Sequence, residues 1–147
     1  MSGYVRVSNM DQVLKGFNLT EARVDQAALI AVSQAALAIE AQAKANANTG
    51  SHAPGLPHIG PRTGEGPNIV TGNLVNRIKA SPATKGMKGY TAIVGSSAEY
   101  ARAIELGNPI WKSGVKFPYL TPAANKLMAS GVLNRIFTTA FIRVVKG

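Results

Sequence analysis

The strongest constraint on the fold is a long amphipathic stretch from about Glu21 to Lys44. Its apolar residues recur at steps of three and four, the spacing that gives an α-helix one buried face. The residues on this face are Val24, Ala28, Val32, Ala35, Ile39 and Ala43. The pattern therefore predicts a single long helix that packs along a core.

Two larger apolar residues, Ile30 and Leu37, interrupt the opposite face of this helix. They are seven residues apart and so lie nearly in line. The rest of that face is polar and consists of Gln26, Ser33, Glu40 and Lys44. Isolated exposed hydrophobic residues are common on monomers, but this helix is also rich in small alanines that permit close approach. We therefore interpret Ile30 and Leu37 as a contact with another subunit or layer.

Short elements are expected on both sides of the helix. The sequence predicts a strand at Tyr4–Val7 and a brief helical turn at residues 8–17. After the helix, Asn46–Asn68 is dense in Gly, Pro, Asn, Ser and Thr without periodicity, which predicts a long loop that is functional or orders on binding. Strands are predicted at Leu74–Ala80 and Tyr90–Val94, and the connection SPATKGMKG makes the pair a hairpin candidate.

Capping signals predict two short helices. Ser96 and Glu99 have the spacing of a capping box that opens the first of them. Gly107 stands where a left-handed C-cap would end it. Thr121 and Pro122 fit the N-cap and the first residue of the second helix.

The last part of the chain predicts an amphipathic helix. Apolar pairs recur every four residues between Val132 and Val145, although their β-branched content leaves a strand as the alternative. The length of 147 residues fits one domain over residues 1–147, with the long loop at about 46–68 inserted in it.

The net charge is +9, from 16 Lys and Arg against 7 Asp and Glu. Such a balance favours polyanionic partners, either DNA or the acidic surface of another protein. The basic residues are scattered, with loose groups at Arg77, Lys79, Lys85 and Lys88 and at Arg135, Arg143 and Lys146. The alternative interpretation is that these side chains are solvated surface and no more.

Composition excludes several classes of protein. The chain has no cysteine, which excludes disulfides, thiolate nucleophiles and sulfur-ligated zinc. The first residues lack the basic and then apolar pattern of a signal sequence. The most apolar segment, Ala27–Ala43, is interrupted by polar residues and is short for a bilayer span. We therefore expect a soluble protein without membrane contact, made in the cytoplasm.

No catalytic or cofactor-binding pattern is evident. The glycine-rich stretches lack the lysine spacing of a phosphate-binding loop. His52 and His58 lie in the predicted loop with only Glu65 near them, which is a poor basis for zinc binding. The acids do not cluster in sequence as paired-carboxylate or Ser-His-Asp catalysis requires. We expect no enzymatic activity, no metal and no cofactor, and keep a hydrolytic enzyme as a competing hypothesis.

Glu105 stands alone in an apolar and basic passage, at the end of a predicted short helix. It could be a catalytic acid, a metal ligand or one half of an ion pair. The helix dipole disfavours a carboxylate at this end of a helix, and a buried unpaired carboxylate is costly. We therefore favour an ion pair with Arg77, Arg102 or a basic residue of a neighbouring subunit.

Three aromatic residues, Trp111, Phe117 and Tyr119, flank a loop that contains prolines. Stacking on nucleic-acid bases is one interpretation. Anchoring the loop on the core or on a partner is the commoner role of such residues.

Three motifs in a fixed order give the chain a family resemblance. They are Thr-Gly-x-Leu (Thr71, Gly72 and Leu74), Tyr-Ala-x-x-x-Glu-x-Gly (Tyr100, Ala101, Glu105 and Gly107) and Pro-x-Leu-x-Pro-Ala (Pro118, Leu120, Pro122 and Ala123). With the long helix before them, they resemble the tail-completion, or head-tail joining, proteins of long-tailed bacteriophages over about residues 26–127. Each motif alone is weak, and the three in order are more specific. The 46–68 loop departs from the family, which has a short link there.

The resemblance implies an α+β subunit: a small, mostly antiparallel sheet with the long N-terminal helix packed across it, short helices and a C-terminal helix. It implies a ring of about six subunits in the virion neck, assembled in the bacterial cytoplasm, that lets DNA pass and has no enzymatic activity. The partners would be other copies of the chain, the head connector or stopper protein and the tail tube protein, with non-specific contact to DNA.

The resemblance also assigns roles to residues. Glu105 would be structural and would fix its turn through hydrogen bonds or an ion pair. The basic hairpin from Arg77 to Lys88 would line the lumen or face an acidic partner ring. The sequence does not separate a tail terminator from a head-side completion protein. A free DNA-binding module is the alternative from a different class, favoured by charge but lacking a recognition helix or an aromatic ladder.

Overall fold

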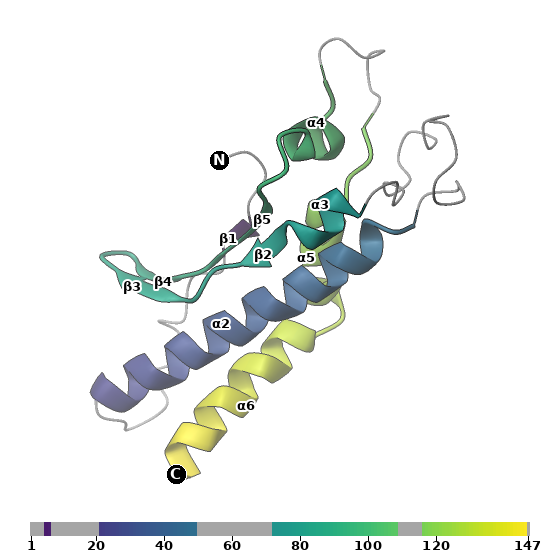
Figure 1. Cartoon of the computed structure of the whole chain (residues 1–147). Coiled ribbons are helices and arrows are strands. Elements are labelled where there is room, and N and C mark those ends of the chain that lie inside the picture. Colours follow the sequence, from purple (N-terminus) through teal and green to yellow (C-terminus); the bar gives the residue numbers. More distant parts are fainter. Residues whose placement is uncertain (1–4, 7–20, 50–71, 109–115, 147) are drawn as a thin grey trace.

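Helix α2 (Glu21–Asn46) runs through the middle of the molecule and contacts the strands on one side and two helices on the other (Figure 1). The computed structural model describes residues 5–6, 21–49, 72–108 and 116–146. The other helices are α3 (Asn73–Asn76), α4 (Ala101–Leu106), α5 (Leu120–Ala129) and α6 (Val132–Lys146). The strands are β1 (Val5–Arg6), β2 (Ile78–Ala80), β3 (Thr84–Gly86), β4 (Gly89–Thr91) and β5 (Ile93–Ser96). The fold is α+β, as the resemblance implied.

The buried surface of α2 is wider than the predicted single face. Its buried residues are Ala27, Ala28, Ala31, Val32, Ala35, Ala36, Ile39 and Ala43. Helix α6 lies beside α2 in the antiparallel direction and α5 packs near its C-terminal half, while the strands cover another side (Figure 1). Alanine has almost no side chain to displace, so neighbouring elements can approach α2 closely on both sides. Larger residues from these elements, among them Phe141, Ile78 and Val94, fill the space between them.

Helix α2 is the one described helix that is long and apolar enough to cross a membrane by length and composition alone. It is longer than the Ala27–Ala43 segment considered above, because the helix extends over 26 residues. Core helices of globular proteins meet the same criterion. Here α2 packs against strands, α5 and α6.

Two small antiparallel sheets make up the β structure. The first has the strand order β1-β5-β2, with Lys79 opposite Gly95 and Val5 opposite Val94, and the second is the β3-β4 hairpin. The chain from β2 to β5 forms one long hairpin that is interrupted near Ser81, whose backbone N–H and Oγ bond the backbone of Ile93. The predicted hairpin is therefore present, and its tip at residues 87–88 projects away from the sheet (Figure 1).

The boundaries of the predicted hairpin were partly wrong. Leu74 and its neighbours form the helical turn α3, because Gly72 allows the chain to turn and its carbonyl accepts the N–H of Asn76 at 2.9 Å. The predicted connection contains β3 and the beginning of β4.

Other predicted elements compare as follows. Strand β1 lies within the predicted Tyr4–Val7, and the final segment is the helix α6 and not a strand. The helical turn predicted at residues 8–17 lies outside the described residues, as does most of the predicted 46–68 loop.

The packing of α2 predicts a sharp contrast between two of its residues. Replacing the fully buried Ile39 by Ala should lower the free energy of unfolding by about 2–5 kcal/mol, because it leaves a cavity in the core. Leu37→Ala, two residues away at 57% exposure, should change it by less than about 0.5 kcal/mol. Urea unfolding of both variants measures this, and equal losses would contradict the described orientation of α2.

Candidate functional site

The carboxylate of Glu105 is buried at 4% exposure and accepts three backbone N–H groups. Its Oε2 lies 2.8 Å from the nitrogen of Tyr119 and 3.0 Å from that of Leu120, and its Oε1 lies 2.8 Å from that of Thr121. These are N–H groups at the start of α5, where a helix has no carbonyl of its own to offer. Glu105 therefore caps α5 from another helix, α4.

This arrangement corrects two predictions. Within the described ranges Glu105 makes no ion pair, with Arg77, Arg102 or any other base. Helix α5 begins at Leu120, so Thr121 is not its N-cap. The charge of Glu105 is instead balanced by N–H dipoles and by the positive end of α5, which favours an anion. Burial and the nearby Glu105 raise the pKa of Tyr119 to about 12, so this phenol stays protonated.

Hydrogen bonds link the three sequence motifs to one another, and we call their residues the motif junction: Gly72, Leu74, Tyr100, Ala101, Glu105, Gly107, Pro118, Leu120, Pro122 and Ala123. Asn73 in the first motif donates from Nδ2 to the hydroxyl of Tyr100 in the second at 3.2 Å. Glu105 links the second motif to the third, and the amide of Asn46 at the end of α2 donates to the carbonyl of Tyr119 at 3.0 Å. The junction thus fastens α2, α3, α4 and α5 to one another.

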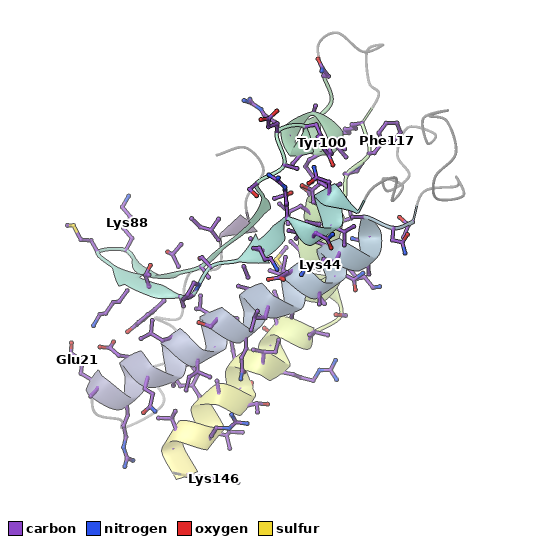
Figure 2. All side chains as sticks on the ribbon, in the orientation of Figure 1. Glu21, Lys44, Lys88, Tyr100, Phe117 and Lys146 are labelled. Carbon is purple, nitrogen blue, oxygen red and sulfur yellow. The ribbon has the colours of Figure 1, made fainter. Side chains whose placement is uncertain are left out.

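The remaining motif residues divide between core and surface. Leu74, Ala101, Leu120 and Ala123 are buried, whereas Pro122 is exposed and Tyr100 is partly exposed. Thr71 lies outside the described residues. Figure 2 shows Tyr100 and Phe117 beside α4, where the N–H of Phe117 donates to the carbonyl of Ile104 at 2.8 Å.

Both motif glycines have backbone angles that other residues rarely adopt. Gly72 has φ 76° before α3, and Gly107 has φ 90° after α4. Gly107 does end the helix, but its ψ of 159° is not that of the predicted left-handed cap. The predicted capping box is also wrong: Ser96 ends β5, and its Oγ accepts the N–H of Ala98 at 3.3 Å.

Polar side chains of α2 bind the edge of the β structure. Ser33 Oγ accepts the backbone N–H of Ala83 at 3.1 Å, and Glu40 Oε2 accepts that of Ala80 at 2.7 Å. Burial raises the pKa of Glu40, but hydrogen bonds from Lys44 and the Ala80 N–H outweigh it and hold the pKa below its usual value. The sequence prediction placed these residues on the polar face opposite the core and did not foresee that they accept backbone N–H groups of the long hairpin.

Asp25 fastens the β3-β4 hairpin to the beginning of α2. Its Oδ2 accepts Lys85 Nζ at 2.8 Å, and its Oδ1 accepts the hydroxyl of Tyr90. Glu21 Oε1 adds a weaker contact to Lys85 at 3.8 Å. The hydrogen bonds from Lys85 and Tyr90 lower the pKa of Asp25, and the bond to Asp25 raises the pKa of Lys85.

The two candidate interface residues differ in exposure. Leu37 is 57% exposed, whereas Ile30 is half-buried against the core. Ile30 also lines a groove of about 310 Å³ between α2 and α6, together with Arg23 and Arg143. The sequence spacing aligned Ile30 and Leu37 correctly, but it could not reveal that α6 shields one of them.

The four candidate basic residues separate into three places. Arg77, at the end of α3, and Lys79, on β2, are exposed. Lys85 is engaged by Asp25 and Glu21, and Lys88 extends from the tip of the hairpin (Figure 2). They therefore do not form one continuous cationic strip.

The described residues contain no group of three His, Cys, Asp or Glu side chains that could hold a metal ion. His52, His58 and Trp111 lie outside them. Phe117 and Tyr119 are buried, so they anchor their segment on the core and do not offer free faces to bases.

The sequence did not predict the hydrogen bonds between Glu105 and the start of α5. The contact between Glu105 and residues 119–121 joins segments about fifteen positions apart across a loop. A signal was present: an isolated acid stands in the last turn of one helix and precedes the start of a second helix. That signal indicates capping from another element as well as an ion pair.

The junction predicts a large effect of removing its carboxylate. Glu105→Ala should lower the free energy of unfolding by at least about 3 kcal/mol, because each buried donor left without an acceptor costs ~1–3 kcal/mol. Glu105→Gln should lose less, since its one carbonyl oxygen can still accept from two donors. Thermal and urea unfolding measure both, with the exposed Glu99→Gln as the matched control. An unaffected Glu105→Ala variant would refute the capping role.

The hairpin contact predicts a pH dependence. Because the pKa of Asp25 is lower in the folded protein, its stabilising effect is present above the unfolded pKa near 3.8 and is lost as pH falls through the folded pKa. Asp25→Asn should therefore reduce the melting temperature at neutral pH, and the difference from the parent should vanish at strongly acidic pH. A difference that persists unchanged below pH 3 would mean that the charge of Asp25 has no part in the contact.

Comparison with known proteins gives one match. The family model described as "Bacteriophage HK97-gp10, putative tail-component" matches residues 11–107, which include α2, the strands β2 to β5 and the first two motifs. No curated protein and no solved structure matches the chain. The match covers well over half of the 147 residues. The chain therefore belongs to the HK97-gp10-like family of bacteriophage tail components.

Proposed function

We propose that this chain is a tail-completion subunit that assembles into a ring between the tail tube and the head connector and leaves a channel for DNA. The observation that carries the proposal is the family match over α2 and the first two motifs. A structural tail component needs a rigid body that presents surfaces to several partners, and membership of this family implies a non-enzymatic role in the virion. The neck of the virion is the location that this function requires.

The geometry of the motif junction supports a mechanical role. Glu105, the acid that a catalytic hypothesis would use, has its oxygens occupied by three backbone N–H groups. A general acid must instead be able to reach a substrate atom. The junction fastens four helices, and such a rigid connection suits a subunit that transmits force between a head and a tail.

Leu37 supplies a candidate contact between neighbouring copies. Its side chain is 57% exposed on α2, beside Ser33 and Glu40, which bind the hairpin. A ring repeats one heterologous contact around its axis, so each copy needs two different surfaces. The exposed part of α2 would be one of them.

A head-side completion protein is the second candidate within the same class, because it would use the same surfaces. A free DNA-binding module is the candidate from another class, and the net charge of +9 favours it. Phe117 and Tyr119 are buried, and this weakens the hypothesis of a DNA-binding module, since base stacking needs exposed rings.

The proposal is tested by complementation of a phage that lacks this gene. We expect such a phage to accumulate unjoined heads and tails, and the parent chain to restore infectious particles. Leu37→Glu should fail to restore them, because a charge at a subunit contact is costly. Met128→Glu, which changes an equally exposed residue (59% against 57%) on α5, is the matched control and should restore the titre.

Two results would count against the proposal. Normal joined particles without the gene would contradict a role in completion. Full restoration by a folded Leu37→Glu variant would contradict a ring contact through α2.

A further inference from the structure

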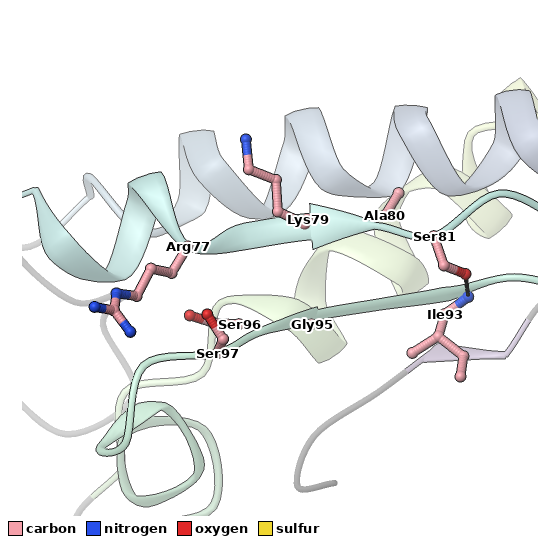
Figure 3. A pocket seen from close by; sticks show the side chains of 8 residues that line it. All are labelled: Arg77, Lys79, Ala80, Ser81, Ile93, Gly95, Ser96 and Ser97. Carbon is pink, nitrogen blue, oxygen red and sulfur yellow. Dashed lines mark hydrogen bonds between the residues drawn. The ribbon is translucent and has the colours of Figure 1, made fainter.

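A groove of about 410 Å³ lies on the sheet surface formed by β2 and β5 (Figure 3). Its origin is the pairing of Lys79 with Gly95: glycine has no side chain, so space remains where a cross-strand neighbour would stand. Arg77 and Ser97 continue the groove toward α4, and the Ser97 N–H donates to the Arg77 carbonyl at 3.3 Å. The two walls of the groove are thus held together by the sheet.

The charged groups that line the groove, among the described residues, are cationic. They are Arg77 and Lys79, and none of the described lining residues is an acid. Neither side chain takes part in an ion pair or a hydrogen bond within the part of the chain that the structure describes. Lys85 differs, because Asp25 already binds it. The groove therefore has two cations available for an anionic partner.

The floor of the groove favours a protein over DNA. It contains Ile93, Ala80 and Gly95, and the hydroxyl of Ser81 is already engaged by the Ile93 N–H at 2.9 Å. A phosphodiester backbone offers only polar atoms to such a floor. A peptide segment with an acidic and an apolar side chain matches both the rim and the floor.

We propose that this groove binds an acidic, extended segment of a partner protein, with carboxylates on Arg77 and Lys79 and an apolar side chain over Gly95 and Ile93. In Figure 3 the side chain of Arg77, just before β2, and that of Lys79, on β2, point in different directions, so a segment that crosses the strand meets one cation on each side. The inference rests on the proposed function in one respect, since it makes the partner a neighbouring neck or tail protein. The basic hairpin was predicted either to line the lumen or to face an acidic partner ring, and this proposal assigns the second role to Arg77 and Lys79.

The test measures binding to the purified full chain and needs no virion. The probe is a dye-labelled peptide, Glu-Leu-Glu-Leu-Glu with blocked ends, followed by fluorescence anisotropy. The comparison probes are Gln-Leu-Gln-Leu-Gln and a 20-base-pair DNA duplex. Arg77→Glu with Lys79→Glu reverses the rim charge, and Gly95→Val fills the groove without a charge change at a glycine whose φ is not positive. Lys88→Glu with Arg102→Glu makes the same change in net charge at exposed positions outside the groove.

We expect the acidic peptide to bind the rim variant about tenfold or more weakly, because each charge-assisted contact is worth about a factor of ten or more. Gly95→Val should weaken binding to a similar extent, because its side chain occupies the space that the peptide would fill. The Lys88 and Arg102 control should bind within about twofold of the parent, since distant surface charges are screened by salt. All variants are first checked for an unchanged melting curve.

Three results would overturn the inference. They are equal binding of the neutral peptide, equal weakening by the control variant, and displacement of the peptide by DNA at lower concentration than by unlabelled peptide. The last would make the groove a phosphate site. None of them bears on complementation by the gene, so failure of this inference is distinguishable from failure of the proposed function.

Discussion

The burial of α2 on two sides is the constraint on which the rest of the structure depends. A helix that packs against strands on one side and against α5 and α6 on the other needs small residues on most of its circumference, and α2 has alanine at six of its eight buried positions. Its polar residues have a second task. Ser33 and Glu40 accept N–H groups of the long hairpin, and backbone donors at a strand edge would otherwise be left unpaired. One helix therefore determines where both layers lie.

The motif junction fixes the elements that lie at the C-terminal end of α2. Asn46, the last residue of α2, binds the carbonyl of Tyr119, and Glu105 binds the N–H of the same residue. The start of α5 is thereby fixed from two elements, and α6 follows α5 after only a short turn at Gly131. This gives a physical reason for the acid in the second motif: it replaces the missing carbonyls of a helix start and meets the positive end of that helix.

The sequence predicted what depends on local periodicity and missed what depends on distant contacts. The helix at Glu21–Asn46, the hairpin and the final helix followed from spacing, because the burial of these elements repeats along the chain. The strand predicted at Leu74 failed because a positive φ at Gly72 turns the chain into α3. Ser96 was assigned a capping role because the spacing to Glu99 is right, but β5 extends to that residue. Glu105 was recognised as structural through the family resemblance, but the sequence did not identify the backbone N–H groups of residues 119–121 as its partners.

A subunit with an exposed Leu37 on α2, exposed cations at Arg77 and Lys79 and a Glu105 carboxylate that is occupied by backbone N–H groups suits assembly with other proteins. The most direct test is electron microscopy of virions in which this chain carries a gold-labelled tag. The account predicts label at the junction of head and tail, in a symmetric arrangement about the tail axis. Label along the tail or on the head, or tagged particles that are infectious and carry no label, would contradict it.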